Sequence, residues 1–148
     1  MSDKTFHVSL HVTDIAASVE RYRQILGTEP AKHFPDYAKF ELADPPVILS
    51  LNLGGPPGTV AHLGIRHAET AEVGAELGRI KGRGLQVLEE GQTTCCYAHA
   101  EKFWVNDADG MPWEIYAVTG DSVVHGAGRA SAPLTEAACV PGGSCCPA

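Results

Sequence analysis

The strongest constraint on the fold is an order of elements that the sequence contains twice. Residues 7–13 alternate polar and apolar side chains with a period of two, which predicts a half-buried strand. A helix is expected over Ile15–Leu26, because Asp14 can cap it and apolar residues recur at helical spacing up to Gly27. Three further strands are then expected at about residues 31–33, 38–42 and 47–53.

The second half repeats the order strand, helix and three strands after a linker rich in Gly and Pro at Gly54–Gly58. Its elements are expected at about residues 61–67, 70–83, 85–90, 95–105 and 113–118. The repeat predicts one domain over residues 1–120, made of modules at about 5–53 and 60–118. Gly, Ala, Ser and Pro dominate residues 121–148, which predicts a flexible C-terminal tail.

Composition narrows the partners and the compartment. The 148 residues are 44% hydrophobic, as in an ordinary soluble globular protein. A formal net charge of −7 argues against nucleic acid and anionic membranes, because both bind cationic surfaces. The sequence contains neither an apolar run long enough to span a bilayer nor a recognisable secretory leader. We therefore expect a cytoplasmic protein whose thiols are kept reduced.

Two adjacent cysteines, Cys95 and Cys96, are the most unusual local feature. Neighbouring Cα atoms lie about 3.8 Å apart, closer than the roughly 4.4–6.8 Å of an unstrained disulfide. The pair is better suited to presenting two soft sulfur donors to one thiophilic atom, such as a heavy metal or trivalent arsenic. Chance adjacency of two small residues is the alternative. Three accessory thiols in the tail, which either transfer arsenic or have no role, are Cys139, Cys145 and Cys146.

Three residues far apart in the sequence are candidate metal ligands. His7 and His62 each lie near the start of the first strand of their module, and Glu114 lies on the last strand of the second. If the modules pair around a shared cleft, two imidazoles and one carboxylate can bind one ion and leave coordination positions open. Each has a simpler explanation, with His7 facing solvent and His62 satisfied in the core. Glu114, between Trp113 and Ile115, needs a partner or a metal in so apolar a strand.

These residues occur within motifs that resemble the vicinal oxygen chelate superfamily, which includes glyoxalase I, fosfomycin-resistance thiol transferases, extradiol dioxygenases and bleomycin-binding proteins. The resemblance implies an α+β fold in which paired βαβββ modules form a curved mixed sheet around a metal cleft. It also implies that the ligands are His7, His62 and Glu114. The motifs that carry it are His7-x-x-x-x-Val12-x-Asp14-Ile15, Arg21-Tyr22-Arg23, Leu26-Gly27, Ala61-His62-Leu63-Gly64 and Asp107-x-Asp109-Gly110-x-Pro112-Trp113-Glu114.

Within that superfamily the chain is similar to the organoarsenical carbon–arsenic lyases and cadmium-induced proteins. This likeness implies an Fe(II)- and dioxygen-dependent enzyme that cleaves trivalent organoarsenicals such as methylarsenite to arsenite, with Cys95 and Cys96 binding the substrate. Relatives can carry Gln at the position of His7. The segments that carry the likeness are Gly27-Thr28-Glu29-Pro30-Ala31-Lys32, Tyr37-Ala38-Lys39-Phe40, Asp44-Pro45-Pro46 and Thr93-Thr94-Cys95-Cys96-Tyr97-Ala98.

Two alternative functions use parts of the same residue set. A resistance protein that sequesters cadmium or arsenite without turnover needs the cysteines alone. A thiol transferase of the fosfomycin-resistance type needs the three metal ligands and no cysteine pair. Glyoxalase activity is disfavoured, because the strand at 47–53 has no carboxylate to serve as a fourth ligand. A homodimer, with the modules paired within one chain or exchanged between two, is compatible with the short linker.

Overall fold

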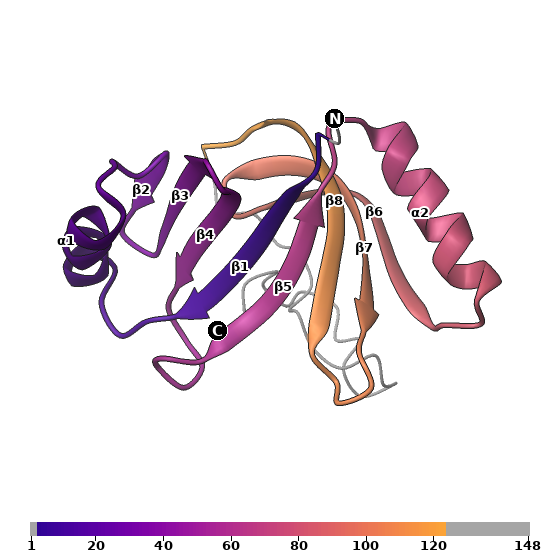
Figure 1. The fold of residues 1–148 in the computed structure, drawn as a ribbon, viewed down its shortest axis with the longest axis horizontal. Helices are drawn as coiled ribbons and strands as arrows, with labels where there is room; N and C mark the ends of the chain where they lie inside the picture. Colours follow the sequence, from indigo (N-terminus) through magenta and orange to yellow (C-terminus); the bar gives the residue numbers. More distant parts are fainter. Residues whose placement is uncertain (1–2, 124–148) are drawn as a thin grey trace.

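The computed structural model describes residues 3–123, whose strands form one curved sheet of eight strands with two helices (Figure 1). This confirms the α+β fold of paired βαβββ modules. The first module contains β1 (Thr5–His11), α1 (Ile15–Leu26), β2 (Lys32–Phe34), β3 (Tyr37–Ala43) and β4 (Pro46–Asn52). The second contains β5 (Val60–Arg66), α2 (Thr70–Gly82), β6 (Val87–Cys95), β7 (Ala98–Asn106) and β8 (Pro112–Asp121).

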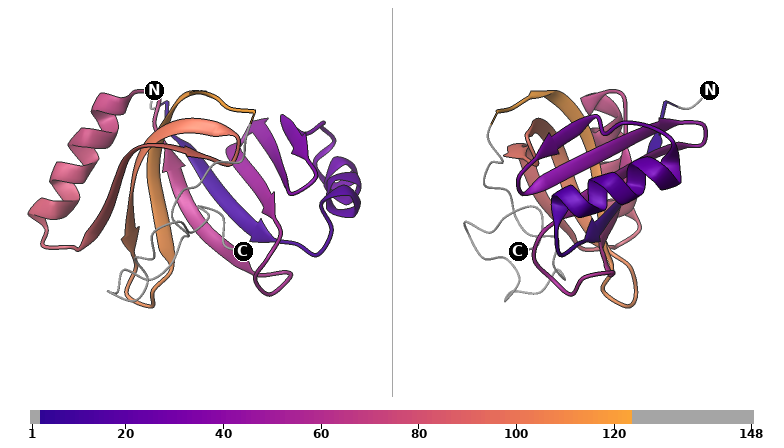
Figure 2. Two further views of the ribbon diagram at one scale, coloured as in Figure 1. Left: turned by 180° about the vertical axis from the view of Figure 1, so that it is seen from behind. Right: turned by 90° about the vertical axis from the view of Figure 1, so that its left-hand side faces the viewer.

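The two modules join through their first strands. The strand order is β2-β3-β4-β1-β5-β8-β7-β6, in which β1 pairs antiparallel with β5 at the centre. On either side, β1 pairs parallel with β4 and β5 pairs parallel with β8. The two halves are thus arranged alike around the central pair, and the sheet curls into an open half-barrel (Figure 2). No helix within residues 3–123 is both long and apolar enough to span a bilayer.

Both helices form where the sequence predicts them. The carboxylate of Asp14 accepts a hydrogen bond from the Ala17 amide at 2.8 Å, and Gly27 ends α1 in the left-handed region at φ 66°. At the start of α2, the side chain of Glu72 accepts from the Glu69 amide at 3.0 Å. The helices lie at opposite ends of the sheet, α1 against β3 and β4 and α2 against β6, β7 and β8 (Figure 1).

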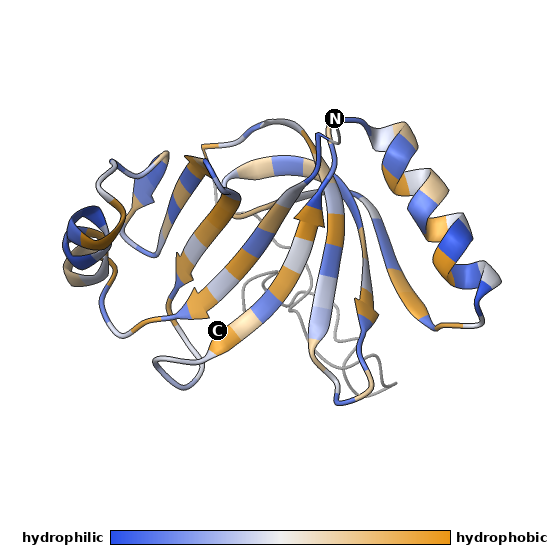
Figure 3. Ribbon diagram, in the orientation of Figure 1, coloured by the Kyte–Doolittle hydropathy of each residue, from blue (hydrophilic) through white to orange (hydrophobic). Residues whose placement is uncertain are grey.

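The sheet strands carry polar side chains on the face away from the helices. On β1, the alternate residues His7, Ser9 and His11 are all buried, and Ser50 and Asn52 are buried beside them on β4. Leu10 of β1 instead packs into the apolar cluster beneath α1. The alternation is visible along the central strands in Figure 3. The sequence pattern allowed this face to be exposed to solvent, whereas the structure buries it, and His7 and Ser50 line a pocket.

The strands around the cysteine pair differ from the prediction. The sequence suggested strands at 85–90 and 95–105, whereas β6 and β7 form one long hairpin that turns at Cys96 and Tyr97. Gly91, between the two predicted strands, lies at a bulge within the strand pairing. The true turn escaped prediction because Cys96 and Tyr97 have φ values of 52° and 61°, a conformation usually adopted by Gly or Asn in such turns.

Candidate metal centre and cysteine pair

Three strands bring the candidate ligands together. His7 lies on β1, His62 on β5 and Glu114 on β8, which are neighbours in the sheet. The ligand atoms of all three lie within 4.8 Å of one another, and the two imidazole rings are 5.3 Å apart in an edge-to-face arrangement. The three residues are buried. The sequence predicts this convergence only if the two modules pair around a shared cleft. The structure brings the three side chains together.

Gly64 makes this convergence possible. In the strand pairing it stands opposite His7 on one side and opposite Glu114 on the other. A Cβ at Gly64 would lie 2.8 Å from the carbonyl oxygen of Glu114 and 3.5 Å from the His7 Cβ. Because glycine has no side chain, the space between the two strands is left to the candidate ligands.

Glu114 is held by two partners, one at each carboxylate oxygen. Its Oε2 lies 3.1 Å from Nε2 of His62, and its Oε1 accepts a hydrogen bond from Nζ of Lys102 at 2.8 Å. Burial by itself raises the pKa of Glu114, but Lys102 and His62 together hold that pKa well below 4.5. The carboxylate is therefore charged at neutral pH, which is the form that binds a metal ion.

His7 is fixed through both ring nitrogens. Its Nδ1 lies 3.0 Å from the Tyr116 hydroxyl, and its Nε2 lies 3.0 Å from Oγ of Ser50. Burial, with a smaller contribution from His62, lowers the pKa of His7 from 6.5 to about 3. Burial also raises the pKa of Tyr116 well above 10, so this hydroxyl keeps its proton. A neutral imidazole with one nitrogen oriented by a hydroxyl is the usual state of a metal-binding histidine.

The cysteine pair lines the same pocket as the candidate ligands. A cavity of about 40 Å³ is lined by His7, His62 and Glu114 together with Cys95 and Cys96. The two sulfur atoms lie 3.0 Å apart, beyond the roughly 2.05 Å of a covalent disulfide bond. The space is enough for a few water-sized groups. Two soft donors and a nitrogen–oxygen ligand set therefore face one small enclosed volume.

The turn that carries Cys96 is anchored to the first module through Tyr97. The Tyr97 ring stacks on Phe34 with centroids 3.5 Å apart and planes 5° apart. Its hydroxyl donates to Asp36 at 2.6 Å, and its carbonyl oxygen accepts from Nζ of Lys32 at 2.6 Å. These contacts place a left-handed turn of the second module against β2 and the turn that follows it, and so fix the sulfurs over the shared cleft.

Several contributors to the pocket were not singled out as site residues from sequence. Lys102 and Tyr116 are two of them, and each contacts a candidate ligand, Glu114 and His7 respectively. His99, close to the cysteine pair in sequence, is exposed and contacts Thr94. Ser50, Lys39 and Arg66 also line the pocket, and Gly64 pairs with His7 and Glu114 in the sheet. The positions of these four residues follow from strand register. The predicted accessory thiols Cys139, Cys145 and Cys146 lie outside the described residues.

The donor set suits a divalent transition metal. Two imidazole nitrogens and one carboxylate oxygen form a three-ligand set of the kind that leaves neighbouring positions open for other molecules. The adjacent strand β4 directs the hydroxyl of Ser50, and no carboxylate, at His7. Among the described residues, this is the group of His, Cys, Asp and Glu side chains whose geometry fits a metal ion.

Comparison with known proteins finds a family match, similar sequences and a similar fold. Residues 4–115 match the Glyoxalase/Bleomycin resistance protein/Dioxygenase superfamily. The chain is 44% identical over 117 residues to a trivalent organoarsenical cleaving enzyme of Thermomonospora curvata, with 78% of each protein covered. It is 39% identical over 122 residues to the cadmium-induced protein CadI of Mycobacterium tuberculosis, covering 82% of this chain and 80% of that protein. The Mn(II)-bound glyoxalase of Novosphingobium aromaticivorans shares the fold, with a TM-score of 0.58 at 17% identity over 88% of this chain and 41% of that chain.

Proposed function

The chain belongs to the glyoxalase/bleomycin resistance protein/dioxygenase superfamily, and from this premise we propose that it cleaves the carbon–arsenic bond of trivalent organoarsenicals. Methylarsenite is the simplest such substrate, and arsenite is the product. Similarity to named organoarsenical cleaving enzymes at 43–44% identity supports this reaction class. The single observation that carries the proposal is the pocket shared by Cys95, Cys96 and the His7, His62 and Glu114 set.

The cysteine pair is proposed to capture the substrate. Two thiols displace the two hydroxyl groups of R–As(OH)₂, which forms two As–S bonds and releases two molecules of water. Because Cys95 and Cys96 line the same small cavity as the candidate ligands, this capture holds the As–C bond next to the metal centre. Holding the reacting bond in place lowers the entropy cost of the chemical step.

We assign Fe(II) to His7, His62 and Glu114, because a set of two histidines and one carboxylate is typical of non-haem iron oxygenases. Bound iron supplies the activation of dioxygen that breaks the As–C bond and leaves an oxidised carbon fragment. The surrounding residues have separate tasks. Lys102 holds Glu114 in its charged form, and Tyr116 orients His7. The reaction needs two small molecules, the organoarsenical and dioxygen, and is proposed to occur in the cytoplasm.

The test of this function is a turnover experiment under controlled oxygen. Protein loaded anaerobically with Fe(II) and methylarsenite should release arsenite only after dioxygen is admitted. Cys96→Ser should lose tight arsenic binding and turnover while it keeps its iron, and Cys139→Ser is the control for loss of a thiol elsewhere. Turnover of Cys96→Ser at the parent rate would contradict the proposed capture step.

The same experiment separates the alternatives. A protein that sequesters arsenite or cadmium would bind methylarsenite through Cys95 and Cys96 and release nothing when oxygen is admitted. A thiol transferase would depend on Mn(II), act on an electrophile other than arsenic and be indifferent to both cysteine substitutions. Arsenite release that requires iron, dioxygen and the cysteine pair together is the outcome expected of the carbon–arsenic lyase.

A further inference from the structure

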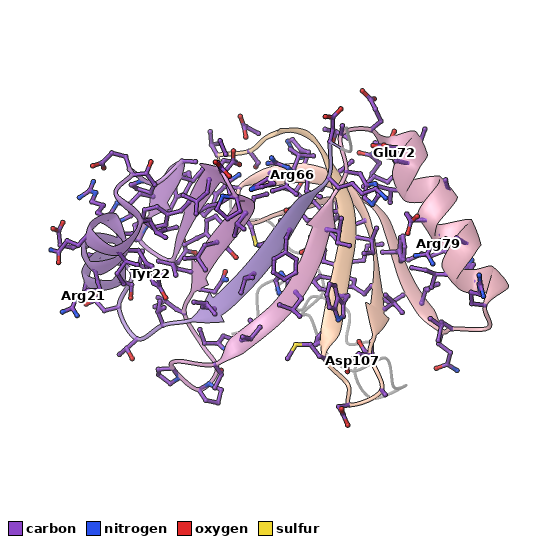
Figure 4. All side chains as sticks on the ribbon, in the orientation of Figure 1. Arg21, Tyr22, Arg66, Glu72, Arg79 and Asp107 are labelled. Carbon is purple, nitrogen blue, oxygen red and sulfur yellow. The ribbon has the colours of Figure 1, made fainter. Side chains whose placement is uncertain are left out.

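The outer wall of the pocket carries a group of charges that the capture of a neutral arsenical does not use. Lys39 of β3 and Arg66 of β5 both line the pocket. They meet at Glu41, whose Oε1 lies 2.7 Å from Nζ of Lys39 and 3.1 Å from Nη1 of Arg66. Arg66, labelled in Figure 4, thus reaches from the end of β5 to β3. We refer to Lys39, Glu41 and Arg66 as the rim triad.

The rim triad carries one more positive than negative charge. Deeper in the pocket Lys102 is balanced by Glu114, so the excess charge belongs to the rim. The Lys39 and Arg66 side chains are 15% and 29% exposed, compared with 2% for Lys102. Among the described residues, Lys39 and Arg66 line the pocket and Glu41 does not. The chain as a whole has a formal charge of −7, so this positive edge is local.

Both rim cations retain donors for a ligand. A guanidinium has five N–H donors in a planar fork that matches a carboxylate, and the hydrogen bond to Glu41 occupies one of them. The ammonium of Lys39 has three. A partly desolvated pair of cations at a pocket mouth attracts an anionic group and raises its rate of encounter. Methylarsenite, with two neutral hydroxyl groups, offers no such anion.

We propose that Lys39 and Arg66 of the rim triad recognise a carboxylate on the thiol that carries the organoarsenical to the enzyme. This inference rests on the proposed function and identifies the form in which the substrate arrives. In a reducing compartment rich in small thiols, trivalent arsenic exchanges its hydroxyl groups for thiolates. The carrier complex is then R–As(SR′)₂, where R′SH is a small thiol that bears a carboxylate. Lys39 and Arg66 bind this carboxylate at the mouth of the pocket, which places the arsenic over the cysteine pair.

Transfer onto the protein is an exchange without oxidation. The sulfurs of Cys95 and Cys96 form two bonds to arsenic, and the two As–SR′ bonds break. The two protons of the protein thiols leave with the carrier, so that two molecules of R′SH are released. Arsenic stays trivalent and the As–C bond stays intact until the cleavage step.

The experiment measures this transfer in metal-free protein, so that it reads out separately from turnover. The full-length chain is used with Cys139, Cys145 and Cys146 changed to Ser, which restricts arsenic to the pocket. Methylarsenite is supplied as its complex with 3-mercaptopropionate, which is anionic, or with 2-mercaptoethanol, which is neutral. The rate of arsenic transfer is followed by intact-protein mass spectrometry. The anionic complex is expected to transfer about tenfold faster, and added salt should reduce this ratio.

Variants of the rim triad should change the ratio in opposite directions. Lys39→Gln and Arg66→Gln are expected to bring it toward one, and Glu41→Gln is expected to increase it, because it removes the competing carboxylate. Arg79→Gln on α2 is the control for loss of a distant arginine and should keep the parent ratio. Equal rates for the two complexes in the parent protein would overturn the proposal, as would rim variants that slow both complexes in parallel.

A further arm tests whether the recognised anion belongs to the substrate. Phenylarsenite and 4-carboxyphenylarsenite are compared, both as complexes with neutral 2-mercaptoethanol. A rim-dependent preference that appears here and is missing with the anionic carrier would overturn the assignment to the carrier thiol. If transfer shows the expected ratios but no arsenite is released by iron-loaded protein in air, the proposed lyase function fails while the rim assignment stands.

Discussion

Gly64 of β5 lies opposite Glu114 of β8, so close that a Cβ on Gly64 would sit 2.8 Å from the Glu114 carbonyl oxygen. Gly64→Ala should push the two strands apart and displace Glu114 from His62. We expect the affinity for a divalent metal to fall by about tenfold or more. The free energy of unfolding should fall by about 1–3 kcal/mol, because the added methyl group overpacks the sheet. Metal titration and denaturant unfolding measure the two effects.

The matched control for this substitution is Gly74→Ala in α2, where an added Cβ meets nothing within 4 Å. It should raise the free energy of unfolding by about 0.5–1 kcal/mol, because alanine favours the helix, and leave metal affinity unchanged. If Gly64→Ala bound metal as tightly as the parent, the close contact with Glu114 would have no role in shaping the site.

Lys102 should contribute most to the free energy of unfolding when no metal is bound. The Lys102 and Glu114 side chains are 2% and 8% exposed, so Lys102→Met leaves a buried carboxylate with less compensation. The free energy of unfolding of the metal-free variant should be about 3 kcal/mol lower than that of the metal-free parent. A divalent metal should recover much of this loss, since it supplies positive charge next to Glu114. The control is Lys81→Met, which removes an exposed ion pair to Glu89 and should cost less than about 1 kcal/mol.

The recovery by metal is the sharper part of this prediction. It is measured as the difference in unfolding free energy between Lys102→Met and the parent, with and without the ion. A difference that is the same in both conditions would mean that the metal does not reach Glu114.

The fold was predictable from sequence because its signals are local. The helix caps at Asp14 and Gly27 and the period-two strands depend on residues that are close together in the sequence. The order of elements also occurs twice. The candidate ligands were also identified, since a charged residue such as Glu114 in an apolar strand demands a partner. Strand register was not predictable: the placement of Gly64 between two ligand strands, and the meeting of Lys39 and Arg66 at Glu41, depend on which residues face each other across the sheet.

The turn at Cys96 and Tyr97 was missed for a different reason. Turn prediction relies on residues that adopt a positive φ easily, and here Cys96 and Tyr97 adopt it at a cost of about 1–2 kcal/mol each. Stacking on Phe34 and the hydrogen bond to Asp36 offset that cost from the other module. The contacts that fix the sulfur positions therefore come from both modules, and the local sequence alone does not predict the turn.

A substitution in this turn should change the free energy of unfolding and arsenic binding in opposite directions. Cys96→Gly removes one side chain from a left-handed position and should raise the free energy of unfolding by up to about 1 kcal/mol. It also removes one of the two sulfurs, so arsenic binding should fall sharply. Cys96→Ser loses the sulfur without relief of the backbone. Equal stability of the two variants in denaturant unfolding would show that the turn is not strained at this residue.

The buried His7 makes stability depend on pH in a defined window. In the metal-free folded protein the pKa of His7 is lowered to about 3, whereas in the unfolded chain it returns to about 6.5. Between these values the unfolded state binds a proton that the folded state does not bind. The free energy of unfolding should therefore fall as pH drops below 6.5, by up to about 1.4 kcal/mol per pH unit from this residue. Chemical denaturation between pH 7 and pH 5 measures the slope.

His7→Gln isolates this contribution, because glutamine does not titrate and can still bond to Ser50. Burial also lowers the pKa values of His11 and His67, so the parent slope includes their effect in the same direction. The variant should keep that part and lose the part due to His7, which gives a shallower slope between pH 6.5 and pH 5. His33→Gln, at an exposed position of β2, is the control and should keep the parent slope. Parallel slopes in His7→Gln and the parent would mean that folding does not lower the pKa of His7, and would contradict its burial as a neutral imidazole.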